Sequence, residues 1–138
     1  MIKLTYLFIT ILSLLILSCT SSNETTNVLI NDIWALESID GVTYSGDENL
    51  KQHPIIEIHL KDEKLIGNTG CNNMNGVVKV DGNEISFSDI ATTKMFCPES
   101  LEQKFLIALG KVNNYKIEKM RLYLFEDDIE KLVFRKID

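Results

Sequence analysis

Two cysteines near the middle of the chain, Cys71 and Cys97, are the residues whose chemistry constrains the interpretation most. They lie 26 positions apart, and the third cysteine, Cys19, belongs to an N-terminal segment of a different kind. In an exported chain a disulfide between them is the natural expectation, because compartments outside the cytosol are oxidising. Such a bridge contributes about 3.5 kcal/mol in the chain-entropy model. The alternatives are two buried free thiols and a redox-active pair, which the lack of a Cys-x-x-Cys motif disfavours.

Three asparagines follow the first of these cysteines within a short glycine-bounded segment. Asn72, Asn73 and Asn75 lie between Gly70 and Gly76. One interpretation is a polar surface that binds a ligand. The other, which we favour, is turn chemistry, because asparagine tolerates left-handed backbone and its side chain bonds to its own chain.

Patterns typical of metal binding and catalysis are missing from the sequence. The only histidines, His53 and His59, flank a strand-like segment, and their spacing matches no zinc-binding pattern. The acidic run 126–128 lacks the register of a calcium loop. The chain has no Gly-x-Ser-x-Gly motif and no phosphate-binding loop. We therefore expect no metal, no cofactor and no enzymatic activity, although paired carboxylates leave no local signature.

The N-terminus reads as a targeting signal and is set apart from the fold, as residues 1–18. Lys3 supplies one positive charge, and residues 4–17 are apolar except for Thr5, Thr10 and Ser13. This segment is shorter than the roughly 20 residues that a transmembrane helix needs. It ends in Ile16-Leu17-Ser18-Cys19, which resembles a bacterial lipobox. The resemblance implies cleavage before Cys19 and lipidation of its thiol; a plain secretory signal is the alternative.

Residues 19–32 are expected to hold the lipidated cysteine and a flexible tether, since residues 20–27 are polar. Acyl chains contribute about 0.8 kcal/mol per buried CH₂, so two or three of them anchor a protein stably. Thr20 directly after the cysteine resembles lipoproteins that are released to the outer membrane. We expect a protein of the cell envelope, lipid-anchored in the outer membrane and facing the periplasm, with the inner membrane as the alternative.

The charge of the chain argues against a nucleic-acid partner. The formal net charge is −6, and loss of residues 1–18 with Lys3 leaves 13 basic and 20 acidic side chains. Binding to phosphates requires clustered lysine and arginine, and no such cluster is present.

The rest of the chain alternates apolar and polar residues in short runs, which is typical of half-buried strands. The predicted strands are 33–39, 55–60, 64–68, 77–80, 84–87, 115–117, 122–125 and 132–135. Turn signals stand at Asp40-Gly41 and Asp81-Gly82, and Gly67 indicates a bulge or a close approach of two strands.

One helix is predicted after Cys97, beginning at Pro98, where no backbone N–H is needed. Its apolar stripe recurs at helical spacing and consists of Leu101, Phe105, Ala108, Leu109 and Val112. Eight or nine strands with one helix predict an α+β fold, in which a strongly curved antiparallel sheet forms an open or cracked barrel with the helix packed across it.

These residues resemble the META domain family, the HslJ-like group of bacterial lipoproteins. The resemblance covers about residues 33–136, and the domain is assigned to residues 33–138. The motif positions that carry it are Gly70, Cys71, Asn72, Gly76, Thr93, Met95 and Cys97. Trp34, Leu36 and the helix residues Glu102 and Phe105 add to it.

The resemblance implies a compact β-rich domain, an association with heat shock and envelope stress, and no established enzymatic chemistry. Our hypothesis is a membrane-anchored lipoprotein that binds an envelope protein partner or supports assembly without catalysis. The alternative is a periplasmic carrier that holds a small apolar ligand between sheet and helix.

We expect the protein extracted from membranes to begin at Cys19 and to carry acyl mass, because the lipobox-like segment directs cleavage and lipidation. Intact mass spectrometry checks this. Alkylation before and after reduction, in the same experiment, reports whether Cys71 and Cys97 are bridged. A mass without acyl groups would contradict the anchor and would indicate a soluble periplasmic or secreted domain.

Overall fold

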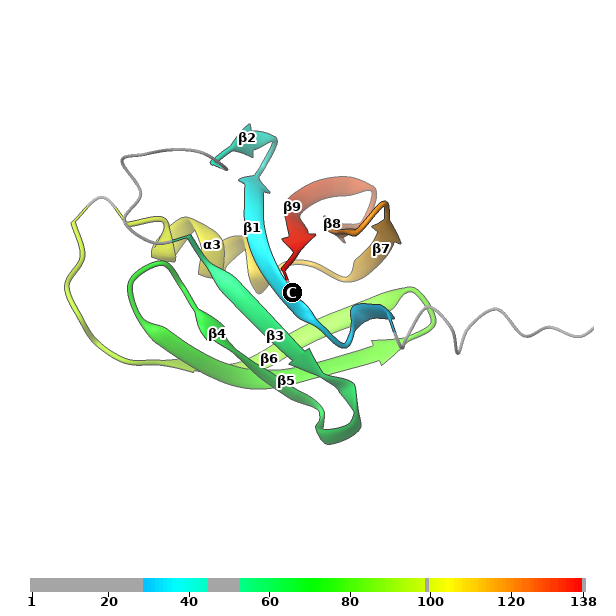
Figure 1. Cartoon of the computed structure of the whole chain (residues 1–138), viewed down its shortest axis with the longest axis horizontal. Coiled ribbons are helices and arrows are strands. Elements are labelled where there is room, and N and C mark those ends of the chain that lie inside the picture. The colour runs from blue at the N-terminus through cyan, green and yellow to red at the C-terminus, as the bar shows by residue number, and fades with distance from the viewer. Residues whose placement is uncertain (1–28, 45–52, 99, 138) are drawn as a thin grey trace, which may run out of the picture.

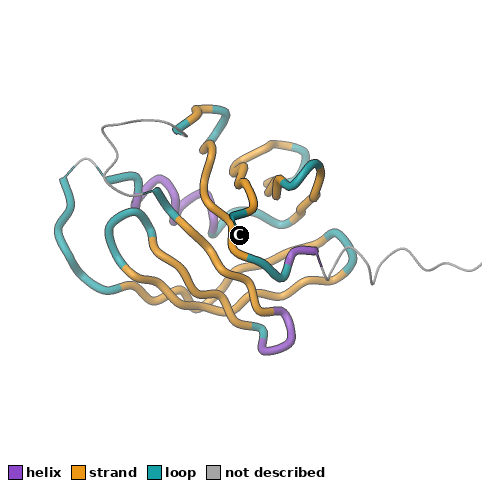
Figure 2. The backbone as a smooth tube through the Cα atoms, viewed as in Figure 1, coloured by secondary structure: helices purple, strands orange, loops and turns teal. Residues whose placement is uncertain are grey.

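A single antiparallel sheet dominates the computed structural model, which describes residues 29–44, 53–98 and 100–137 (Figures 1 and 2). Within these residues the sheet has nine strands and is accompanied by the α-helix α3 (Glu102–Leu109) and the short 3₁₀ helix η2 (Leu60–Asp62). The strands are β1 (Ile33–Ile39), β2 (Val42–Thr43), β3 (Ile55–His59), β4 (Lys64–Asn68), β5 (Asn73–Asp81), β6 (Glu84–Thr92), β7 (Asn114–Glu118), β8 (Arg121–Glu126) and β9 (Ile129–Lys136).

The sheet curls into a ring that is nearly open at one place. The strand order is β2-β1-β3-β4-β5-β6-β7-β8-β9, and β1 also pairs with β9. Between β6 and β7 only one residue pair forms, Glu84 opposite Asn114. Helix α3 connects these two strands in the chain and packs on the core through the buried Phe105. The ring of Phe105 lies edge-on to the ring of Phe134, with the ring centroids 6.2 Å apart. The predicted α+β cracked barrel with one packed helix is confirmed.

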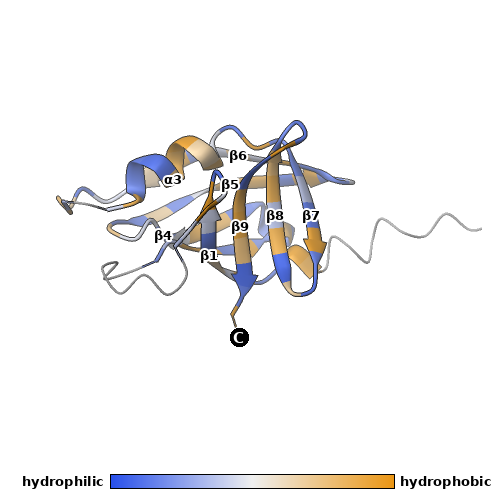
Figure 3. Cartoon of the chain, turned by 90° about the horizontal axis from the view of Figure 1, so that it is seen from above, coloured by the Kyte–Doolittle hydropathy of each residue, from blue (hydrophilic) through white to orange (hydrophobic). Residues whose placement is uncertain are grey.

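Alternation of apolar and polar residues explains why these segments are strands. In β3 Ile56 and Ile58 are buried while their neighbours are partly exposed, and β8 repeats the pattern with Leu122 and Leu124. Orange apolar bands and blue polar bands therefore share the same strands in Figure 3. Because side chains of successive residues point to opposite faces, one face of each strand supplies the core.

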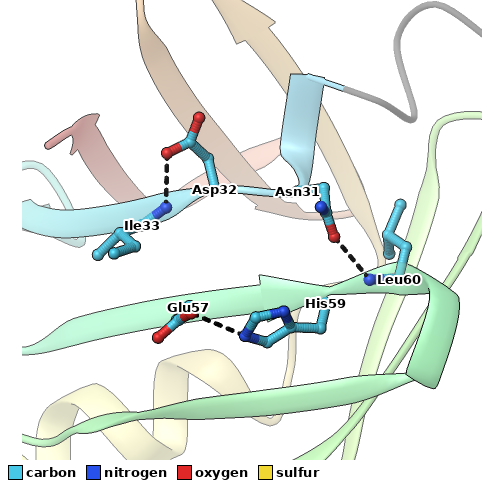
Figure 4. Close-up of polar contacts among 6 residues, drawn as sticks. All are labelled: Asn31, Asp32, Ile33, Glu57, His59 and Leu60. Atoms are coloured by element: carbon cyan, nitrogen blue, oxygen red, sulfur yellow. Dashed lines mark hydrogen bonds and ion pairs between the residues drawn. The ribbon is translucent and has the colours of Figure 1, made fainter. Parts of the chain in front are cut away.

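The core extends from Ile30 to Phe134. Ile30 is fully buried although it lies in the segment expected as tether, and its carbonyl oxygen accepts a hydrogen bond from Trp34 Nε1 (2.9 Å). The next residue is also bonded to the rest of the domain: the side-chain oxygen of Asn31 accepts a hydrogen bond from the N–H of Leu60 (2.9 Å), as Figure 4 shows. Among the described residues the core therefore begins at Ile30.

The carboxylate of Asp32 fastens the first strand to the last. It accepts a hydrogen bond from the N–H of Ile33 (Figure 4) and pairs with Lys136 Nζ at 2.6 Å. Partial burial alone would raise the pKa of Asp32, but the bonds from Lys136 and the Ile33 N–H hold it below its ordinary value.

Several predicted boundaries differ from the structure: β6 runs to Thr92 rather than to residue 87, β9 begins at Ile129 rather than at residue 132, and three further differences have a local cause. Helix α3 begins at Glu102 rather than Pro98, because Pro98 lies in a turn in which Ser100 N–H bonds back to Cys97. Strand β5 begins at Asn73 rather than at residue 77, since its first residues pair with β4. Leu60 leaves β3 for η2, because its N–H bonds to an asparagine side chain instead of a strand.

Gly67 in β4 lies where two strands approach closely. A Cβ atom at this position would stand 2.2 Å from the carbonyl oxygen of Ile55 on β3. The register of β3 and β4 is continuous through Gly67. Of the two sequence expectations, the structure therefore shows the close approach and not a bulge.

Gly67→Ala is expected to lower the free energy of unfolding by about 1–3 kcal/mol, because the strand backbone must move to admit a methyl group. Urea unfolding of the purified domain measures this. The control is Gly110→Ala, where φ is −73° and the nearest atom to an added Cβ is 3.4 Å away. That variant should be neutral or more stable by up to about 1 kcal/mol. Equal destabilisation of the two variants would contradict the close-contact explanation.

Candidate functional site around Asn72

The side chain of Asn72 joins three segments that are distant in the sequence. It is 1% exposed and lies in the turn between β4 and β5. Its Oδ1 accepts hydrogen bonds from Thr93 Oγ1 (2.8 Å) and from the N–H of Met95 (2.7 Å). Its Nδ2 donates to the Glu102 carboxylate (2.9 Å to the nearer oxygen) and to the Met95 carbonyl (3.2 Å). One amide thereby binds the loop after β6 and the first residue of α3.

Thr69, which comes directly after β4, completes this polar cluster. Its hydroxyl donates to Glu102 and accepts from the N–H of Asn72 (2.9 Å), while its own N–H donates to the Asn72 carbonyl (2.8 Å). Gly70, with φ of +86°, lets the chain turn between them. The Glu102 carboxylate is thus held by two neutral side chains, a hydroxyl and an amide.

A disulfide lies directly beside the cluster. Cys71 and Cys97 are bonded, with their Cα atoms 5.9 Å apart. The loop 93–97 is therefore held at its first and third residues by Asn72 and at its last residue by the bridge. Both attachments act on backbone that would otherwise have little to pack against.

This loop presents two large apolar side chains to solvent. Phe96 is 92% exposed and Met95 60%, and on the neighbouring helix Ile107 is 55% exposed. A surface hollow of about 500 Å³ joins the loop to the helix. Its lining consists of Cys71, Met95, Phe96, Cys97, Ser100, Glu102, Gln103, Leu106 and Ile107. We call Met95, Phe96, Leu106 and Ile107 the loop–helix surface.

The structure brings most of the motif positions together. Gly70, Cys71, Asn72, Thr93, Met95 and Cys97 all belong to the cluster or to the bridge beside it. Gly76 instead lies within β5, at the register shift against β6. Cys19 lies outside the described residues.

Asn72 lies in the turn between β4 and β5, as the turn interpretation expects, but most bonds of its side chain reach residues more than twenty positions away. Asn73 and Asn75 are exposed residues of strand β5. Sequence reasoning also missed Thr69, and it placed Glu102 only as a charge at the helix start. The available signal in the sequence was a threonine directly before Gly-Cys-Asn, and it is a weak one.

The two histidines take no part in this cluster. His59 pairs with Glu57 on the same strand, at 2.8 Å (Figure 4), as expected for a solvent-facing residue. His53 Nδ1 is buried without a hydrogen-bond partner among the described residues. In the same part of the chain no group of three or more histidine, cysteine or acidic residues is arranged to hold a metal. No helix among the described residues is long and apolar enough to cross a membrane.

The fold and the cluster define a small domain with a cracked barrel, one helix and a braced apolar loop. The META domain family model matches residues 27–138, and the chain belongs to this family.

Solved structures share the fold. An NMR structure of a protein from Burkholderia xenovorans has a TM-score of 0.65 at 19% identity, covering 88% of this chain and 92% of that one. The crystal structure of a DUF4847 family protein from Bacteroides vulgatus ATCC 8482 has a TM-score of 0.60 at 15% identity, covering 83% and 99%. At such identities the likeness concerns the fold alone. No curated protein matches the chain.

Asn72→Ala is expected to lower the free energy of unfolding by roughly 2–4 kcal/mol, because several buried polar groups lose their partner at once. Urea unfolding measures the loss. Asn75→Ala is the control, since this exposed asparagine lies in the same segment, and a surface substitution changes stability by about 0.5 kcal/mol or less. Similar effects of the two substitutions would contradict the bracing role of Asn72.

Proposed function

We propose that this META-domain protein is a lipid-anchored component of the bacterial cell envelope that acts by binding or by supporting assembly, without catalysis. The observation that carries the proposal is the loop–helix surface. A phenylalanine that is 92% exposed costs free energy in water, and here the loop that carries it is fixed by a buried amide and a disulfide. Rigid presentation of an apolar surface favours binding, because little conformational entropy is lost on contact.

The polar groups of the cluster support a structural role rather than a reaction. Glu102 is occupied by the Asn72 amide and the Thr69 hydroxyl. A general acid or base acts within hydrogen-bond reach of a substrate proton and is commonly paired with a second titrating group. The described partners of Glu102 do not titrate, and His59 is engaged with Glu57 on β3.

The expected site of action is the outer membrane, facing the periplasm, with Cys19 as the lipid attachment point. The Cys71–Cys97 bridge supports an oxidising compartment. An envelope protein partner and a role under heat shock or envelope stress agree with what the family resemblance implies.

The carrier alternative gains no support from the described residues. Twelve large side chains, among them Trp34, Phe105 and Phe134, are fully buried and fill the inside of the sheet. Three hollows that described residues line all open to the solvent. We therefore retain the binding role alone.

Photo-crosslinking from the anchored protein tests this role. We expect benzoylphenylalanine in place of Phe96 to give adducts on irradiation of cells, because this side chain reaches the bound component. The same residue in place of Ile129, which is 63% exposed at the start of β9, is the matched control. Adduct mass separates protein from lipid. The binding role fails if position 96 yields nothing above position 129.

A further inference from the structure

We infer that the loop–helix surface inserts into the headgroup region of a lipid bilayer that carries anionic lipids. This inference rests on the proposed binding role and names its partner; an envelope protein would then use another surface.

The apolar part of the surface has the shape of a projecting tip. Phe96 and Met95 follow each other in the loop, and Ile107 and the half-buried Leu106 border the same hollow from α3. In Figures 1 and 3 the loop and the start of α3 lie at one end of the domain. A projecting phenylalanine with aliphatic neighbours is typical of side chains that enter the boundary between headgroups and acyl chains.

Three exposed lysines lie in the loop, in α3 and just after it, although the protein as a whole is acidic. Lys94 precedes Met95 in the loop, Lys104 lies on α3 three residues before Ile107, and Lys111 lies in the turn that follows the helix. None of these three lysines forms an ion pair with a described residue. The same stretch carries two carboxylates, so the lysines outnumber the acids by one. Glu102 bonds into the polar cluster and borders the hollow, and Glu99 lies outside the described residues. Cations around an apolar tip complement anionic headgroups.

The lysines also decide between a bilayer and other partners. Protein interfaces are depleted in lysine relative to the rest of the surface, whereas helices that lie on membranes are rich in lysine on their polar face. A second copy of the chain would bring two sets of three lysines together, and like charges facing each other cost several kcal/mol. The observations therefore favour lipid.

The position of the tip fits a protein attached at two points. The start of the described chain, before β1, and the loop between β6 and α3 lie at opposite ends of the domain in Figures 1 and 3. The ten residue steps from Cys19 to Leu29 span at most about 35 Å. An anchor at one end and an inserted loop at the other would lay the long axis of the domain along the bilayer, and two weak attachments together bind membranes stably.

Tryptophan fluorescence tests the inference on residues 27–138, the span that the META domain model matches and that holds every core residue the structure describes. The only tryptophan, Trp34, is buried and supplies a constant background. Phe96→Trp should shift its emission to shorter wavelength on addition of vesicles with 70% phosphatidylcholine and 30% phosphatidylglycerol, and far less with phosphatidylcholine alone. Ile129→Trp, an exposed position on β9, should not respond.

A lysine series measures the charge contribution in the same assay. Lys94→Gln, Lys104→Gln and Lys111→Gln together, in the Phe96→Trp background, should weaken vesicle binding about a hundredfold, or about fivefold per lysine. The matched control replaces Lys61, Lys64 and Lys119 by glutamine, three exposed lysines outside this surface, and should bind nearly as before. Circular dichroism verifies that each variant is folded.

Three outcomes overturn the inference: no emission shift with anionic vesicles, an equal shift from position 129, or equal weakening by both lysine triples. Because the vesicle assay contains neither Cys19 nor other proteins, its failure leaves the anchor and the binding role untouched. Crosslinks from position 96 to protein without lipid would likewise overturn the bilayer contact while supporting the proposed function.

Discussion

The side-chain amide of Asn72 is the interaction on which the rest of this structure depends. It satisfies groups from the loop after β6 and from the start of α3, and it does so from a turn between two other strands. In a dry interior each such group without a partner would cost about 1–3 kcal/mol. The amide thus ties the loop after β6 and the first residue of α3 to the turn between β4 and β5.

The disulfide and the Asn72 amide both hold the loop 93–97 in place, by different physical means. The Cys71–Cys97 bridge reduces the number of conformations that the unfolded chain can adopt, and this stabilises the domain. The bridge alone does not select one conformation of the loop. The hydrogen bonds of Asn72 select one conformation among those that the bridge allows. An exposed, apolar loop needs both, because it gains almost nothing from burial of its own side chains.

Patterns that repeat locally were readable from the sequence, and contacts between distant residues were not. Alternation in β3 and β8 and the stripe from Leu101 to Val112 predicted the strands, the helix and the fold class. The role of Asn72 escaped because its partners lie 21 to 30 positions away. The exposure of Phe96 escaped for a different reason: aromatic residues are usually found inside. The start of α3 was misplaced since a turn after the bridged Cys97 precedes it.

The pairing of β1 with β9 has a consequence for biosynthesis. The ring closes only when residues 33–39 meet residues 132–136, so its closing contacts join the two ends of the domain sequence. Contacts of such high sequence separation form slowly and late in folding. A chain still emerging from the ribosome lacks β9 and has no closed sheet to form. Such a topology delays closure of the sheet until the last strand has been synthesised.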